Sequence, residues 1–255
     1  MKKSLPLKYI VVAIFIVIWF CASNCFFVND LFLPSPQRVW KAFVEICLNG
    51  YKGVPLIVHI TESLRRLFIA YLLAAITAIP LGLLSGYNSV FRDVIEPIIN
   101  FYRPLPPLAY YTLLILWLGI GDGSKIFLLF LASFAPLYIS CSQAVSRIEP
   151  NYIYSAKALG AKRRQVFRTV VFPYVLPDIF SGLRTAMGVG YTTLVAAEMV
   201  ASRGGIGWMV LDASNYLRSD IIFVGILIMG ITGIILDNII IIIGRLAAPW
   251  KGKNV

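Results

Sequence analysis

Long apolar runs alternate with shorter polar segments along this chain, in the pattern of membrane-spanning helices. A helix needs about 20 mainly apolar residues to cross a bilayer core about 30 Å thick. Six runs approach that length, at residues 9–28, 67–87, 104–121, 126–145, 178–201 and 221–244. The third opens with Pro-Leu-Pro-Pro and the fifth is rich in glycine, alanine and threonine, so these two are the weakest. The pattern predicts an all-α fold, a polytopic transmembrane helical bundle of six spans.

The composition agrees with a membrane protein. Hydrophobic residues make up 59% of the chain and charged residues 14%, whereas soluble proteins carry about 25% charged residues. The formal net charge of +11 raises the alternative of a nucleic-acid partner. The cations lie between the apolar runs and form no separate basic module, so we expect membrane lipid as a partner and no nucleic acid.

The distribution of cations predicts the orientation. With the N-terminus inside, 14 lysines and arginines fall in inner segments and 8 in outer ones, while Arg184 lies at the inner end of the fifth run. Cytoplasmic loops carry the excess of these residues, so both termini are predicted to be cytoplasmic. Lys2, Lys3 and Lys8 before the first run also resemble a signal peptide. The run is long for such a peptide, and CASNCFFVND offers no clean Ala-X-Ala site, which favours an uncleaved helix.

Residues 29–66 are predicted to form an external segment. Ser35 is placed to cap a helix that has Pro36 at its first position. Residues 36–48 are amphipathic, so we expect this helix to lie on the membrane surface. Residues 54–66 are expected to lead helically into the second span.

A basic loop at 151–177 separates the fourth and fifth runs. Glu149 and Pro150 are predicted to open a short helix with residues 152–159, which ends at Gly160 because glycine adopts the left-handed conformation at a helix end at little cost. A second short helix is predicted after it, with Pro173 and Pro177 breaking the chain before the fifth span. Composition alone favours an ordinary cytoplasmic loop. The alternative is a loop to which a cytoplasmic partner docks.

Charged residues near the spans invite a functional interpretation, because such groups are costly in lipid. Glu62 and Arg66 are four residues apart and could form a weak surface pair. Arg184 is expected to extend toward the inner membrane surface. Glu198 lies near the outer end of the fifth span and could face a water-filled pathway or its external mouth. Asp237 interrupts an aliphatic run and needs a polar partner or a cavity.

Small residues recur at every fourth position of the fifth span, at Gly182, Ala186 and Gly190. Such spacing lets two helix backbones approach closely. The stripe either packs within one bundle or, as the family resemblance described below implies, lines a pathway at the two-fold axis of a dimer. On the second interpretation, Thr193 and Glu198 join it as pathway or dimer-interface residues.

The chain shows no catalytic motif. It lacks the glycine-rich ATP-binding loop, so it cannot bind ATP in the usual way. Its one histidine, His59, and the absence of Cys-X-X-Cys spacing argue against a metal site. We therefore expect no enzyme activity, no cofactor and no metal.

The loop and its surroundings resemble a known family. Ala-X-X-Leu-Gly-Ala, an apolar residue seven positions after the glycine, and Pro-X-X-X-Pro-X-Ile-X-X-Gly-Leu-Arg are similar to the coupling loop of binding-protein-dependent ABC importer permeases. FLPSPQRVW, RPLPPLAYYTLLILWLGIGDGSKI and GLRTAMGVGYTTLVAAEMVASRGGIGWMV resemble the taurine, nitrate and sulfonate group of that family, the taurine branch most of all. The match covers about residues 30–250.

The resemblance implies a type I importer permease core (MetI-like) with one extra N-terminal helix. It divides the chain into 1–60, with the first span and the external segment, and 61–250, the permease domain with a coupling loop at 146–177. Tyr154 and Ser155 depart from the family's Glu-Ala-Ala opening, while Ala156 and Gly160 match. The coupling residues implied are Tyr154, Ser155, Ala156, Leu159, Gly160, Ala161, Val166, Phe167 and Pro173.

The resemblance also implies partners and a function. The implied partners are an ABC ATPase dimer on the cytoplasmic side, a periplasmic or lipid-anchored solute-binding protein and a second copy of the permease. The implied location is the bacterial cytoplasmic (inner) membrane. Taurine or another alkanesulfonate leads as substrate, with nitrate or a thiamine-precursor pyrimidine as alternatives. A secondary transporter, which often shows inverted repeats, and a membrane-embedded enzyme are the rivals from other classes; the sequence shows neither a repeat nor a catalytic set.

Overall fold

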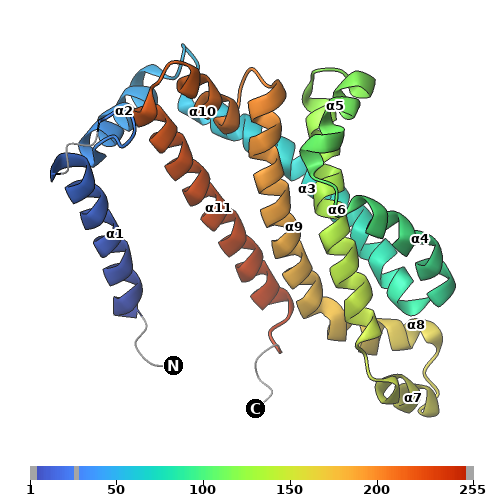
Figure 1. Cartoon of the computed structure of the whole chain (residues 1–255). Coiled ribbons are helices and arrows are strands. Elements are labelled where there is room, and N and C mark those ends of the chain that lie inside the picture. The colour runs from blue at the N-terminus through green and yellow to red at the C-terminus, as the bar shows by residue number, and fades with distance from the viewer. Residues whose placement is uncertain (1–4, 26–28, 251–255) are drawn as a thin grey trace. The chain divides into compact units, whose positions relative to one another are not determined.

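The structure is a computed structural model that describes residues 5–25 and 29–250. Lys2, Lys3, Lys251 and Lys253 of the orientation argument, and the end of the first predicted span at 26–28, lie outside this range. Within it the regular elements are helices, as predicted (Figure 1). They are α1 (Leu5–Cys25), α2 (Pro36–Asn49), α3 (Leu56–Tyr87), α4 (Ser89–Tyr102), α5 (Pro107–Leu118), α6 (Asp122–Ser146), α7 (Pro150–Ala158), α8 (Arg163–Val166), the π-helical turn η1 (Phe167–Val171), α9 (Phe172–Ala201), α10 (Ile206–Asn215) and α11 (Ser219–Ala247).

Four helical runs in the described range are long and apolar enough to cross a membrane. They are α3, α6, the continuous run Arg163–Ala201 and α11. They coincide with four of the six predicted spans. The other two coincide with shorter apolar helices, Ala13–Asn24 within α1 and Pro107–Leu118. Twelve residues of α-helix are about 18 Å long, so neither of these shorter stretches reaches across a bilayer core by itself.

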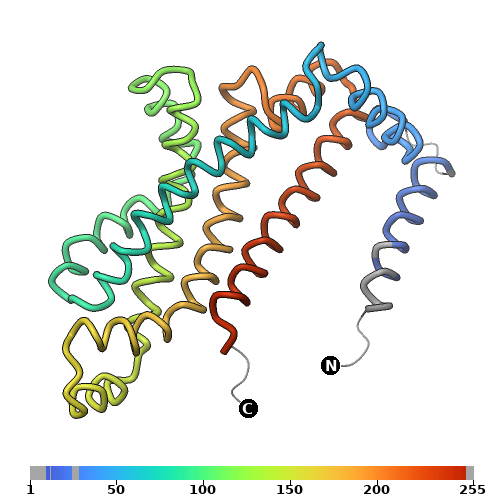
Figure 2. Tube along the Cα trace, turned by 180° about the vertical axis from the view of Figure 1, so that it is seen from behind, coloured from blue at the N-terminus to red at the C-terminus, as the bar shows by residue number. Residues whose placement is uncertain are grey.

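The chain divides into two compact units, Met1–Glu62 with Arg203–Gly230, and Ser63–Ser202 with Ile231–Val255. In the second unit, α6 lies side by side with α9 (Figures 1 and 2). It also approaches α3 closely, since a Cβ added at Gly82 would lie 2.7 Å from the Cβ of Cys141. Small residues on α3 and α9 therefore allow both helices to pack tightly against α6.

In the first unit, α2 packs against α10 and the beginning of α11. Val39, Ala42 and Ile46 on one face of α2 share a core with Met209 and Ala213 of α10. The predicted cap is confirmed, because the backbone N–H of Arg38 donates to Ser35 Oγ, 3.4 Å away, and Pro36 begins the helix. The apolar face of α2 with Val39, Ala42 and Ile46 is thus covered by protein.

A small polar cluster fixes the turn between α2 and α3. The Tyr51 hydroxyl donates to Asp212 of α10 at 2.7 Å, and Lys52 forms an ion pair with the same carboxylate at 2.7 Å. Burial opposes ionisation of Asp212, but the hydrogen bonds from Lys52 and Tyr51 outweigh it and hold the pKa of the carboxyl below its usual value.

Candidate functional site

The glycine corner, which we define as Leu159, Gly160 and Ala161, ends α7 as predicted. Gly160 has a φ of +82°, in the left-handed region. Its N–H donates to the carbonyl of Lys157 at 2.9 Å, and the N–H of Ala161 donates to the carbonyl of Ala156 at 3.1 Å. This pair of bonds is the Schellman arrangement, in which a glycine reverses the chain and satisfies the last helix carbonyls. The corner is thus fixed by local backbone geometry.

The two sides of this loop differ in exposure. Ile153, Ala156 and Phe167 pack against the hydrophobic core of the second unit, and Val166 is fully buried in it. Leu159 is 89% exposed and has no comparable packing. The loop is thus anchored from within and presents its corner outward.

The outward surface combines apolar and basic side chains. Tyr152 and Tyr154 are exposed along with Leu159, as is Ser155. The exposed cations around them are Lys157, Lys162, Arg163, Arg164 and Arg168. An apolar tip with a basic rim suits a protein groove with an acidic edge.

Pro173 and Pro177 do not break the chain, which corrects the prediction. The helical run continues from Arg163 to Ala201 and changes direction between α8 and α9 (Figures 1 and 2). Just before Pro173 lies the π-helical turn, in which the N–H of Phe172 donates to the carbonyl of Phe167, five residues back. A wider turn relieves the clash that a proline ring makes in a regular α-helix. The helix therefore continues through both prolines instead of ending before them.

The predicted stripe on α9 faces α6. A Cβ added at Gly182 would lie 2.6 Å from the Cβ of Ser140, and one at Gly190 would lie 2.5 Å from Ser133 Oγ. Ala186 between them is fully buried. This is the packing alternative that the sequence left open; a role of these residues in the pathway or at a dimer interface stays a prediction.

Thr193 and Glu198 are also buried. The Thr193 hydroxyl donates to the backbone carbonyl of Val189 at 2.8 Å. Glu198 is 1% exposed, and its two carboxylate oxygens share the single hydroxyl proton of Ser63, whose Oγ lies 2.8 and 2.9 Å from them. The structure thus brings Glu198 together with α3, while a role of Thr193 and Glu198 in the pathway or at a dimer interface stays a prediction.

Glu198 belongs to a wider set of charged and polar side chains that we call the Arg66 network: Ser63, Arg65, Arg66, Asp122 and Glu198. Arg66 Nη1 donates to Glu198 at 2.8 Å and its Nε to Asp122 at 2.7 Å, while Arg65 also pairs with Asp122. Arg66 is only 6% exposed, so it does not lie on the surface as expected, while its pairing with Glu62 stays a prediction. The network joins α3, α6 and α9, and the sequence offered no signal for it beyond the charges themselves.

Arg184 and Asp237 form a further ion pair, separate from the Arg66 network. Arg184 Nε and Nη2 donate to the two oxygens of Asp237 at 2.7 and 2.8 Å. Asp237 thus has the polar partner that the sequence required, while Arg184 pairs with α11 instead of simply extending to the membrane surface. The pair links α9 to α11 by a two-bond fork, the strong form of a charged hydrogen bond.

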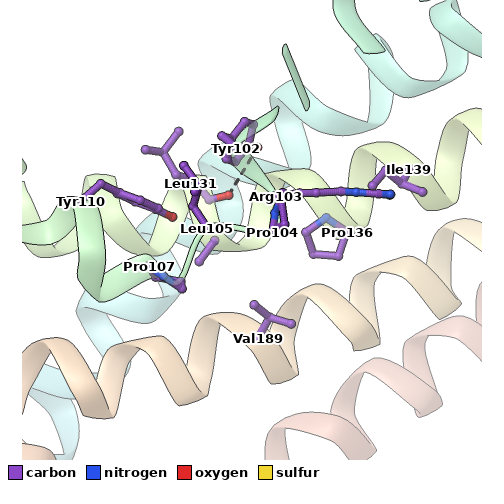
Figure 3. A pocket seen from close by; sticks show the side chains of 11 residues that line it. Tyr102, Arg103, Pro104, Leu105, Pro107, Tyr110, Leu131, Pro136, Ile139 and Val189 are labelled. Carbon is purple, nitrogen blue, oxygen red and sulfur yellow. Dashed lines mark hydrogen bonds between the residues drawn. The ribbon is translucent and has the colours of Figure 1, made fainter. Parts of the chain in front are cut away.

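A cavity of about 370 Å³ lies beside the Arg103-Pro104-Leu105 segment (Figure 3). Pro136 of α6 and Val189 of α9 also line it, and the Tyr102 hydroxyl donates to the carbonyl of Leu131 at 3.5 Å. Its lining is mainly apolar. The segment between α4 and α5 thus lines this cavity together with α6 and α9.

Comparison with known proteins identifies the family. Residues 78–251 match the model of binding-protein-dependent transport system inner membrane components. The taurine transport system permease protein of Escherichia coli (strain K12) is 36% identical over 99% of this chain and 92% of its own length. A nitrate import permease protein of Synechocystis sp. is 30% identical over 99% of this chain and 96% of its own.

A solved structure agrees on the fold. The inward-facing MetNI methionine ABC transporter matches 72% of this chain and 95% of the compared chain, with a TM-score of 0.57 and 17% identity. That identity supports the fold alone. The chain is a multi-pass membrane permease, a transport component and not itself a catalyst, and it belongs to the family of binding-protein-dependent transport system inner membrane components.

Proposed function

We propose that this permease imports a small sulfonate, taurine or another alkanesulfonate, in an ATP-driven cycle. The observation that carries the proposal is the 36% identity to a taurine permease over nearly the whole chain. Nitrate is the alternative, because a nitrate permease matches over the same length at 30% identity. A thiamine-precursor pyrimidine remains the third candidate.

We assign ATPase coupling to the glycine corner. Leu159, the most exposed apolar residue of the loop, inserts into a groove on a cytoplasmic ATPase, with Tyr154 and Ser155 beside it. The shape of this loop is maintained by Ala156, Gly160, Ala161, Val166, Phe167 and Pro173. ATP closes the ATPase dimer, the corners of two permease copies move together, and the helices change from inward- to outward-facing. A binding protein outside the membrane then releases the solute into the open pathway.

The proposed topology has six crossings with both termini in the cytoplasm. In it α1 forms the first crossing, and α5 with its flanking residues completes the third. Residues 1–60 form the extra N-terminal part and 61–250 the permease domain. A cysteine at Gln165 is then labelled only from the cytoplasmic side, and one at Asn215 only from outside.

Reconstitution tests the function. The permease is placed in proteoliposomes with its partner ATPase and solute-binding protein, and uptake of labelled taurine and nitrate is measured with and without ATP. We expect ATP-dependent taurine uptake that excess ethanesulfonate suppresses. The matched control is an ATPase whose ATP-binding lysine is replaced. Uptake that persists with this control, or without the ATPase, would instead indicate a secondary transporter.

A further inference from the structure

The exposed side of α9 differs from the exposed side of α11. We define the polar face of α9 as Ser181, Arg184, Thr185, Gly188 and Thr192, all of which are exposed. Ser181, Thr185, Gly188 and Thr192 recur at intervals of three or four residues, and Arg184 lies three residues after Ser181 and four before Gly188, so all five share one side of the helix. The exposed residues of α11 include Ile231, Ile234, Ile235 and Ile242. Aliphatic side chains suit lipid, whereas hydroxyl groups and an arginine suit water or protein.

The ion pair on this face is the second observation. The Arg184 and Asp237 side chains are 48% and 43% exposed, although both sit within long apolar helices. Charges in spans face a bundle interior or a water-filled space, because hydrocarbon solvates them poorly. The pair therefore marks a side of the chain that is not covered by lipid.

A cavity of about 530 Å³ adjoins the pair. Ser181 and Arg184 line it from α9, and Ile240, Gly244 and Arg245 line it from α11. Ile240 is only 7% exposed and lies within this packing. The two charged residues in the lining are both arginines, and Asp237 is not in the lining. The cavity is thus suited to an anion.

We infer that this cavity is a relay site for a small oxyanion in the transport pathway, and that the anion replaces Asp237 on Arg184. The inference rests on the proposed function, whose site it deepens. A guanidinium fork that holds two carboxylate oxygens fits two oxygens of a sulfonate or nitrate equally well. Asp237 keeps Arg184 aligned when no anion is present. Asp237 also competes with the anion for Arg184 and so keeps anion binding weak. Weak binding is needed in a pathway so that the solute can leave.

The first test probes the charge of the cavity with no need for transport. Ser181→Cys is made in the full-length permease with Cys21, Cys25, Cys47 and Cys141 replaced by serine. The rates of modification by an anionic and a cationic methanethiosulfonate reagent are compared, each relative to a free thiol. We expect the anionic reagent to be favoured about tenfold, since the two arginines in the lining exceed the single carboxylate of Asp237 beside it and a positive cleft concentrates anions. Ile234→Cys on the aliphatic side of α11 is the unreactive control.

Arg184 variants identify the source of this preference. In the Ser181→Cys protein, Arg184→Gln should reduce the preference to less than about twofold, while Arg184→Lys should keep it. Equal rates with the two reagents, a preference that survives Arg184→Gln, or a Ser181→Cys as unreactive as Ile234→Cys would each overturn the inference.

Protection by anions tests the exchange itself. Ethanesulfonate should slow modification of Ser181→Cys several-fold, and less so with Arg184→Lys, because lysine lacks the two-bond fork. Protection by nitrate but not ethanesulfonate would support the relay and reassign the solute. Absence of protection by either anion would overturn the relay, whereas failed uptake in the reconstituted system would count against the proposed function alone.

Discussion

The glycine corner and the Arg66 network are held by contacts of very different range along the chain. The hydrogen bonds at the corner join residues three to five positions apart. Those of the network join side chains 56 to 135 positions apart. The corner also presents Leu159 to solvent, whereas Glu198 in the network is almost fully buried. Substitutions at the two places should therefore separate loss of function from loss of stability.

The largest effect is expected at the Arg66 network. Glu198→Leu leaves Arg66 without one of its buried partners, and such a loss costs about 3–5 kcal/mol of unfolding free energy. Thermal unfolding of the detergent-solubilised protein measures it. Glu96→Leu, which removes only the exposed Arg92–Glu96 pair, is the control and should change stability by about 0.5 kcal/mol or less.

The double variant Arg66→Leu/Glu198→Leu sharpens this test. It removes both charges, so it should be less destabilised than Glu198→Leu alone, because no arginine is left short of a partner. If Glu198→Leu proves no more harmful than Glu96→Leu, the network does not hold α3, α6 and α9 together.

A smaller loss of stability is expected where α9 packs on α6. Ala186→Leu adds volume to a fully buried position, which typically costs about 1–3 kcal/mol. Gly230→Leu is the control, since a Cβ there meets nothing within 4 Å. We expect Ala186→Leu to insert and bind the ATPase but to transport poorly. Wild-type uptake by Ala186→Leu would show that this contact does not constrain the transport cycle.

Gly160→Val should cost about 1–2 kcal/mol, because a β-branched residue is strained at a φ of +82°. The protein should still reach the membrane, while co-purification of the ATPase is lost. Gly230→Val, at a helical position with open space around it, is the matched control. Normal co-purification and uptake with Gly160→Val would remove the corner from the coupling mechanism.

The smallest change in stability, about 0.5 kcal/mol or less, is expected for Leu159→Ser, because this side chain is largely in solvent. Its ATPase co-purification should nevertheless fall. Val166→Ala provides the opposite control in the same loop, since it truncates a fully buried side chain and should destabilise by about 1–3 kcal/mol. A Leu159→Ser protein that keeps its ATPase would place the docking contact elsewhere.

The features that the sequence predicted well depend on local chemistry. Ser35 and Pro36 start α2, Glu149 and Pro150 start α7, and Gly160 ends it, because caps and turns are set within a few residues. The apolar runs likewise located α3, α6, α9 and α11.

What the sequence did not provide was the face of each helix and the partner of each charge. Spacing showed that Gly182, Ala186 and Gly190 share a side of α9, but not that this side meets α6. Arg66 could not be matched to Glu198, 132 positions away, from periodicity. The length of α5 was overestimated because apolar composition continues beyond the residues that are helical.

The π-helical turn at Phe167–Val171 has a consequence for the length of the loop. Each residue of an α-helix turns the chain by about 100° around the helix axis. The single extra residue in a wider turn therefore sets how the loop before it is rotated relative to α9 after it. Deleting one residue there would rotate the preceding segment, with Leu159, by about 100° around the helix axis relative to α9, and would bring back the clash at Pro173 that the wider turn relieves. The number of residues in this segment, more than their chemical identity, therefore determines the direction in which the permease offers its corner.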